Sequence, residues 1–154
     1  MISKKQLKTS FGEPLLASGY RRKGQTWYKD VGDITLIVNL QKSDFSNDYY
    51  VNLAINIKEL TGEDIVPEHK CHIRLRAKDT MLKCRHGVNN LMFLDFPDLE
   101  ADEHATALKE LSAAIVSIMD GLSSLEQLAG AYAEGKLAGA AVRKNAEPLL
   151  TEGN

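Results

Sequence analysis

Amide, imidazole and guanidinium side chains alternate with apolar residues in the segments expected to form β-strands. Residues 35–43 read TLIVNLQKS, so Asn39 and Gln41 lie two positions apart and belong to one face of a strand. Arginine donates to carboxylates or phosphates, amides hydrogen bond in pairs, and aromatic rings give rigid contact area. The predicted binding residues are Trp27, Asn39, Gln41, Tyr50, Asn52, Asn56, His72, Arg74 and Arg76.

The strands that must position these side chains are recognised by their alternation of apolar and polar residues. In the second strand, Leu36, Val38 and Leu40 are expected in the core. In the fourth, Cys71 is expected on the apolar face and His72 on the polar face. The predicted strands are Thr26 to Asp30, Ile34 to Lys42, Tyr49 to Lys58, Cys71 to Ala77 and a short one within residues 88–96.

Helical patterns precede and follow the strands. At the N-terminus, Ser3 and Gln6 fit a capping box, and Gly12 with Pro14 predicts a break in the helix that follows. From Asp98 onward the apolar period becomes helical. The expected C-terminal elements are a helix with the stripe Leu108, Leu111, Ile115, Ile118 and Leu122, a short helix ending near Gly135, and a last helix from Leu137 to Leu150.

Strands grouped between helices predict an α+β fold. We expect an antiparallel sheet of four to five strands, with an N-terminal helix and two to three C-terminal helices packed on one face. Residues 1–150 are predicted to form a single domain and residues 151–154 a flexible tail. The other face of such a sheet can remain in contact with water, and it collects the polar side chains.

Composition limits the possible classes of protein. The chain has 154 residues, of which 44% are hydrophobic and 26% charged, which argues against intrinsic disorder. Its net charge of −2 and pI near 6.1 argue against a general affinity for nucleic acid or acidic membranes. No signal peptide and no apolar run of about 20 residues are visible, which predicts a cytoplasmic protein without a membrane segment.

Several segments resemble a known family. They are GYRRKGQTWYKD at residues 19–30, VNLQKS at 38–43, YYVNLAINI at 49–57, CHIR at 71–74 and MDGLSSLEQL at 119–128. The pattern covers most of the chain and is similar to the DUF4304 family, a domain of unknown function. The resemblance implies one compact α+β domain and no particular activity.

Histidine and cysteine cluster between residues 69 and 86, and both are zinc ligands. The spacing H-x-C-H followed by C-x-H is not a usual zinc pattern, and the adjacent Cys71 and His72 are expected on opposite sides of a strand. Cys84 and His86 do not form a recognisable nucleophile and base pair. No nucleophile elbow, phosphate-binding loop or dinucleotide motif is present, so no catalytic residue, metal or cofactor is predicted.

The leading functional prediction is a non-enzymatic domain that binds a protein partner through the polar sheet face. An inhibitor or immunity-type protein is one biology that would fit this prediction, although no motif points to it. The alternative is an enzyme or small-ligand binder with an anion pocket around His72 and Arg74, which Asn39 and Asn52 would complete. Single-stranded nucleic acid is a weaker third candidate, because the chain lacks a clear basic footprint. It also stays open whether the polar side chains simply satisfy one another, or whether a helix covers them.

Overall fold

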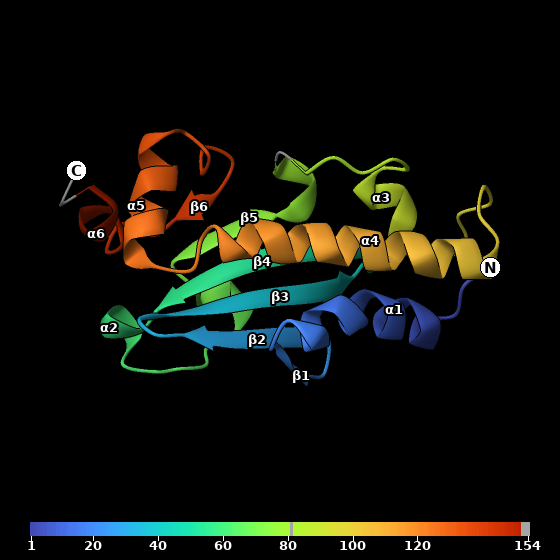
Figure 1. The fold of residues 1–154 in the computed structure, drawn as a ribbon, viewed down its shortest axis with the longest axis horizontal. Helices are drawn as coiled ribbons and strands as arrows, with labels where there is room; N and C mark the ends of the chain where they lie inside the picture. The colour runs from blue at the N-terminus through green and yellow to red at the C-terminus, as the bar shows by residue number, and fades with distance from the viewer. Residues whose placement is uncertain (81, 152–154) are drawn as a thin grey trace.

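A six-stranded antiparallel sheet forms the centre of the protein. A computed structural model gives the structure and describes residues 1–80 and 82–151 (Figure 1). The strand order β1-β2-β3-β4-β5-β6 follows the chain. The predicted α+β class is confirmed, with one strand more than the upper number expected. The strands are β1 Arg21–Lys23, β2 Thr26–Val31, β3 Ile34–Lys42, β4 Tyr49–Ile57, β5 Ile73–Arg76 and β6 Ala141–Val142.

One face of the sheet is covered by helices, and α1 and α4 cross it in Figure 1. Leu36, Val38 and Leu40 of β3 point into the core between the sheet and these helices, as predicted. The helices are α1 Lys4–Ala17, α2 Lys58–Thr61, α3 Val88–Leu91, α4 Ala101–Asp120, α5 Leu125–Ala133 and α6 Glu147–Thr151, with short 3-10 turns η1 Glu68–Lys70 and η2 Ala77–Asp79.

The first helix is continuous, so the predicted break at Gly12 and Pro14 is wrong. Ser3 and Gln6 form the expected capping box, and α1 then continues to Ala17 with Pro14 inside it. Proline removes only one hydrogen bond here, close to the end of the helix. The stripe of Leu7, Phe11 and Leu15 is fully buried against the core, which compensates for that loss.

Two further predictions in the second half of the chain are wrong. Residues 88–96 form α3 and turns, and only Phe93 makes a strand-like bridge, to Asp48. The buried apolar residues of this segment continue beyond the helix, which ends at Leu91. A short apolar run of this kind cannot be assigned to a helix or a strand from its periodicity alone.

The predicted helix from Leu137 to Leu150 is replaced by turns, β6 and α6. Part of this segment pairs with the edge of the sheet instead, because β6 forms antiparallel pairs with Ile73 and Arg74 of β5. Of the predicted tail, Thr151 ends α6 and residues 152–154 lie outside the described residues. Within the described ranges, no helix has both the length and the apolar character needed to cross a bilayer.

Candidate functional site

The second face of the sheet, opposite α1 and α4, carries a row of polar side chains across five strands. We call this set, Lys23, Thr26, Asn39, Asn52 and Arg76, the amide row. Each member is the direct cross-strand partner of the next. At the usual strand spacing the row is roughly 19 Å long. It contains no carboxylate, and a cation lies at each end.

Hydrogen bonds between side chains fix the orientation of the amides. The Asn39 Nδ2 donates to Thr26 Oγ1 over 2.8 Å, and the Asn52 Nδ2 donates to Asn39 Oδ1 over 3.0 Å. The same Asn52 nitrogen also donates to Gln41 Oε1 over 3.1 Å. Three of the predicted binding residues are therefore brought together in one network. Asn52 is only 5% exposed, so it orients the partly exposed Asn39 and the exposed Gln41 rather than offering its own amide to a partner.

Lys23 and Arg76 are the two cationic ends of the amide row. Within the described part of the chain, neither Lys23 nor Arg76 takes part in an ion pair. The Arg76 guanidinium instead lies 4.1 Å from the centre of the Tyr50 ring. Beside it is a shallow hollow of about 220 Å³, lined in part by Asn52, Arg74 and Arg76. Glu68 and Asp79 line the same hollow, so it carries charges of both signs.

Part of the second face is covered by residues 61–71, which we call the strap. In Figure 1 the chain that follows α2 passes on the side of the sheet away from α4. Thr35 Oγ1 donates to the Asp64 carbonyl, and Asn56 Nδ2 donates to the Glu63 carbonyl over 2.9 Å. Asn56 is completely buried as a result. The strap thus removes the predicted binding residue Asn56 from contact with any partner.

A small apolar cluster holds the strap down. Val66 and Cys71 pack against Ile37 and Ala54 of the sheet. Burial, with a smaller contribution from Glu68, raises the pKa of the Cys71 thiol to about 12. Cys71 therefore lies under the strap, and its predicted position on the helix-covered face is wrong.

His72 and Arg74 do not form the predicted anion pocket. His72 is only 2% exposed, and its Nδ1 accepts a hydrogen bond from the Ile57 amide over 3.0 Å. Arg74 is paired with Glu68, with Nε to Oε1 at 2.9 Å and a second bond from the same guanidinium. The strand begins only at Ile73, because the η1 turn precedes it and interrupts the alternation. The predicted exposure of His72 on the polar face is therefore wrong.

The predicted placement of Trp27 on the polar face is also wrong. Its side chain is fully buried on the helix side of the sheet, with its ring 5.5 Å from that of Phe11 at an angle of 66°. The register explains this position: Trp27 pairs with Val38, which points into the main core. Its neighbour Tyr28 lies on the second face instead.

Phe45 is a surface feature that the sequence reasoning missed. It is 98% exposed in the turn between β3 and β4, at the end of the hairpin where Gln41 pairs with Tyr50. The Phe45 amide donates to Ser43 Oγ over 3.2 Å, and the Lys42 amine also binds this turn. The signal was a lone aromatic residue in the polar turn SDFSND. The turn at the end of the β3–β4 hairpin therefore presents an apolar ring to the surroundings.

His72 should make the folded state sensitive to acid. Burial, assisted by the charge of Arg143, lowers the pKa of His72 below its ordinary value of 6.5. The unfolded chain therefore binds this proton more readily, so the contribution of neutral His72 is present above about pH 6.5 and lost as the pH falls below it.

The test compares urea midpoints of the wild type and His72→Asn between pH 8 and pH 5. Asparagine can still accept from the Ile57 amide but does not titrate. We expect a smaller fall in stability for the variant. Equal falls in the two proteins would contradict the assignment.

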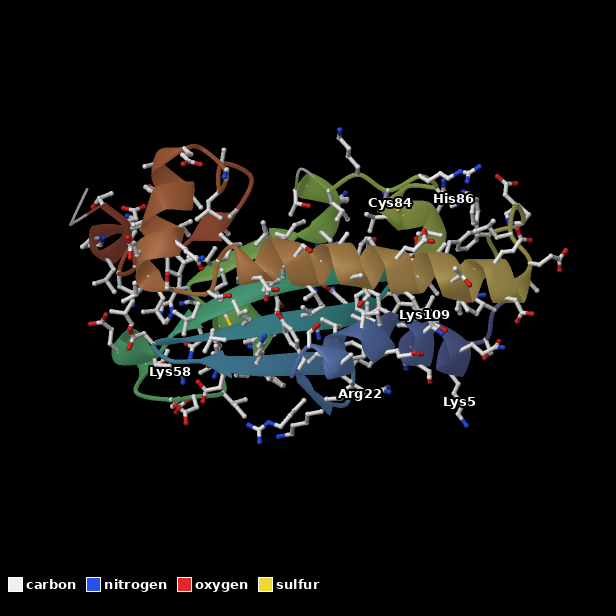
Figure 2. All side chains as sticks on the ribbon, in the orientation of Figure 1. Lys5, Arg22, Lys58, Cys84, His86 and Lys109 are labelled. Atoms are coloured by element: carbon white, nitrogen blue, oxygen red, sulfur yellow. The ribbon has the colours of Figure 1, made fainter. Side chains whose placement is uncertain are left out.

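The cysteine and histidine residues do not gather into a metal site in the part of the chain that the structure describes. Cys84 and His86 lie near α3 (Figure 2), while Cys71 is under the strap. Cys84 shares a small cavity of about 70 Å³ with His86 and Glu110. Nothing in this arrangement defines a nucleophile and its base.

Comparison with known families identifies the chain. Residues 11–120 match a family described as Domain of unknown function (DUF4304). These residues include the first five strands, the strap and α4, so they contain the complete amide row. Comparisons with curated proteins and with solved structures found no match. The match extends over most of the sequence, and the chain therefore belongs to the DUF4304 family.

Proposed function

We propose that this protein is a non-enzymatic binding domain whose amide row and Phe45 dock onto an acidic surface of a protein partner. The observation that carries the proposal is Phe45, an almost completely exposed aromatic residue in the turn of the β3–β4 hairpin, the two strands that carry Asn39 and Asn52 of the row. Aromatic and arginine side chains supply most of the energy in many interfaces. An exposed aromatic ring gains little from binding a small anion, so it favours a protein partner with an apolar contact of its own.

Electrostatics supports an acidic partner. Lys23 and Arg76 occupy the two ends of the row, and the described residues offer them no carboxylate within ion-pair distance. Opposite charge on a partner would speed association and fix its orientation. The amides between them are already oriented, so little side-chain freedom is lost on binding.

A rigid sheet with a preorganised polar face suits a protein that neutralises another protein by covering it. We therefore include an inhibitor or immunity-type role in the proposal. Cys71 and Cys84 are both free thiols, which supports a cytoplasmic location. The alternative enzyme with an anion pocket lacks support, since His72 and Arg74 are engaged elsewhere. The alternative of single-stranded nucleic-acid binding is also weakened, because Trp27 is buried and cannot stack on a base.

Affinity capture from the extract of the native cell tests the proposal. The baits are the wild type, Lys23→Glu/Arg76→Glu, Phe45→Ala and a control, Lys4→Glu/Lys5→Glu. Lys4 and Lys5 are exposed on α1, and Figure 2 shows Lys5 pointing away from the body of the protein. The control therefore makes the same change of net charge outside the proposed site.

We expect one partner to be recovered with the wild type and the control, and lost with the other two baits. With purified partner, Phe45→Ala should weaken binding about 30-fold, as expected for an aromatic anchor worth about 2 kcal/mol. Circular dichroism would verify that each bait is folded. A partner that binds the charge-reversed row as tightly as the wild type would refute the proposed surface.

A further inference from the structure

A second concave site lies at the C-terminal end of the fold, away from the amide row. It has a volume of about 710 Å³ and lies between the last turns of α4, the helix α5 and the turn that follows α5. We call it the apolar pocket. Its apolar lining includes Leu75, Leu82, Ile118, Leu122, Ala131 and Leu137.

The volume and lining are those of a ligand site. Pockets that hold small organic molecules usually measure roughly 300–1,000 Å³ and are mostly apolar with a few polar groups. Leu75, Leu122 and Leu137 are buried, so they make a fixed floor. Thr80 and Gln127 add hydrogen-bonding groups to the lining.

Gly130 provides a second, independent observation. It lies inside the helix α5 and lines the apolar pocket, although glycine is disfavoured in helix interiors. Apart from its chain neighbours and the backbone of its own helix, no atom of the described residues lies within 4 Å of the position that a Cβ would take there, and its φ is outside the left-handed region. Neither crowding nor backbone conformation therefore requires glycine at this position. The absence of a side chain at Gly130 leaves this part of the pocket open.

The charges around the pocket argue against an anionic ligand. Lys136 and Glu134 neutralise each other, with Nζ to Oε2 at 2.9 Å. Asp79 also lines the pocket and, among the described residues, has no ion-pair partner. The remaining local charge is negative, so it would repel a carboxylate or phosphate.

We propose that the apolar pocket binds a small, predominantly apolar organic molecule that carries no negative charge. This site is separate from the amide row in both its residues and its chemistry. The apolar body of the ligand would occupy the space beside Gly130, and a hydrogen-bonding end would reach Thr80 or Gln127. The pocket lies mostly beyond residue 120, where the family match ends.

The test uses the uncharged fluorescent probe N-phenyl-1-naphthylamine and its sulfonated relative 1-anilinonaphthalene-8-sulfonate. Fluorescence titrations are made with the wild type, Gly130→Leu and a control, Ala113→Leu. Leucine at position 130 would fill the pocket while favouring the helix, so this variant should remain folded. Ala113 is an exposed residue of α4, and leucine there adds the same apolar group outside the pocket.

We expect saturable binding of one molecule of the uncharged probe to the wild type and to Ala113→Leu. Gly130→Leu should weaken that binding roughly tenfold or more, because a few added carbon atoms occupy the site. The sulfonated probe should bind the wild type more weakly than the uncharged one. Lys23→Glu/Arg76→Glu should bind the uncharged probe as tightly as the wild type does. A failure of the amide-row proposal can therefore be distinguished from a failure of the pocket proposal.

Two results would overturn the inference. One is a wild-type protein that shows no saturable binding of the uncharged probe. The other is equal binding by Gly130→Leu and the wild type, which would place the probe elsewhere on the surface. Tighter binding of the sulfonated probe would reject the proposed class of ligand.

Discussion

Replacing Trp27 by alanine is expected to lower the free energy of unfolding by about 3–5 kcal/mol, the usual loss when a large aromatic side chain leaves a core. The ring is fully buried, packs edge to face with Phe11 and lies against the backbone of Gly12. A Cβ at Gly12 would lie only 2.8 Å from the Trp27 ring, so the two residues fit closely. Little around the ring can move in to fill the cavity.

The measurement is denaturant unfolding followed by circular dichroism, because Trp27 is the only tryptophan and its own fluorescence disappears with it. Phe45→Ala is the matched control, since it removes an aromatic ring that is almost completely exposed. We expect a change within about 0.5 kcal/mol for that control. Trp27→Phe should lose less than Trp27→Ala, because it keeps a ring and removes an indole N–H that has no hydrogen-bond partner in the described structure.

A loss below about 1 kcal/mol for Trp27→Ala would contradict the buried position, since exposed substitutions usually fall in that range. It would restore the interpretation of Trp27 as a surface contact, which the sequence suggested. The two interpretations differ in what each variant does. A core residue changes stability, whereas a surface anchor changes binding and leaves the folded state intact.

Alternation within a strand was a reliable guide to the site. It predicted correctly that Leu36, Val38 and Leu40 enter the core and that Asn39 and Gln41 lie on the other face. The reason is geometric, because successive side chains of a strand must point to opposite sides. The same rule failed for Trp27. Alternation within one strand does not give its register against the next, and here an odd position of β2 pairs with an even position of β3.

The sequence pattern of residues 61–71 could not predict that the strap covers part of the second face of the sheet. Residues 61–71 contain no regular alternation, yet they bury Asn56 and Cys71 through contacts with distant strands. His72 was misplaced for a related reason: a 3-10 turn ends just before it, and the strand starts one residue after it. Such end effects are decided by tertiary contacts. The amide row itself became visible only when the register joined Lys23 to Arg76 across five strands.

Asn56 provides the second large expected effect, because the structure assigns it to the strap and not to binding. Its Nδ2 donates to the Glu63 carbonyl over 2.9 Å, and its Oδ1 accepts from Thr61 Oγ1 over 3.2 Å. Replacing it by alanine removes both bonds from a fully buried position. We expect a loss of about 2–4 kcal/mol, the sum of two buried hydrogen bonds and the desolvation of the partner that stays buried.

The local consequence can be read from the thiol of Cys71. Its pKa is raised to about 12 by burial under the strap, so at pH 8 it should react very slowly with a disulfide reagent. With Cys84 replaced by serine, Cys71 is the only thiol left. In that background, Asn56→Ala should speed its reaction by roughly tenfold or more, because local opening follows the lost stability of the strap.

Asn47→Ala is the matched control for Asn56→Ala, since Asn47 is exposed and its side-chain amide donates to the Asp95 carboxylate over 3.1 Å, away from the strap. It should leave the thiol reaction rate unchanged. If Asn56→Ala also left the rate unchanged, the strap would be held by its apolar contacts and the Thr35 bond, and Asn56 would not act as its anchor. If instead Asn56 were a partner-binding residue, its replacement would weaken capture of the partner while Cys71 stayed protected. The thiol rate and the capture yield, measured on the same variant, therefore distinguish a structural asparagine from a binding one.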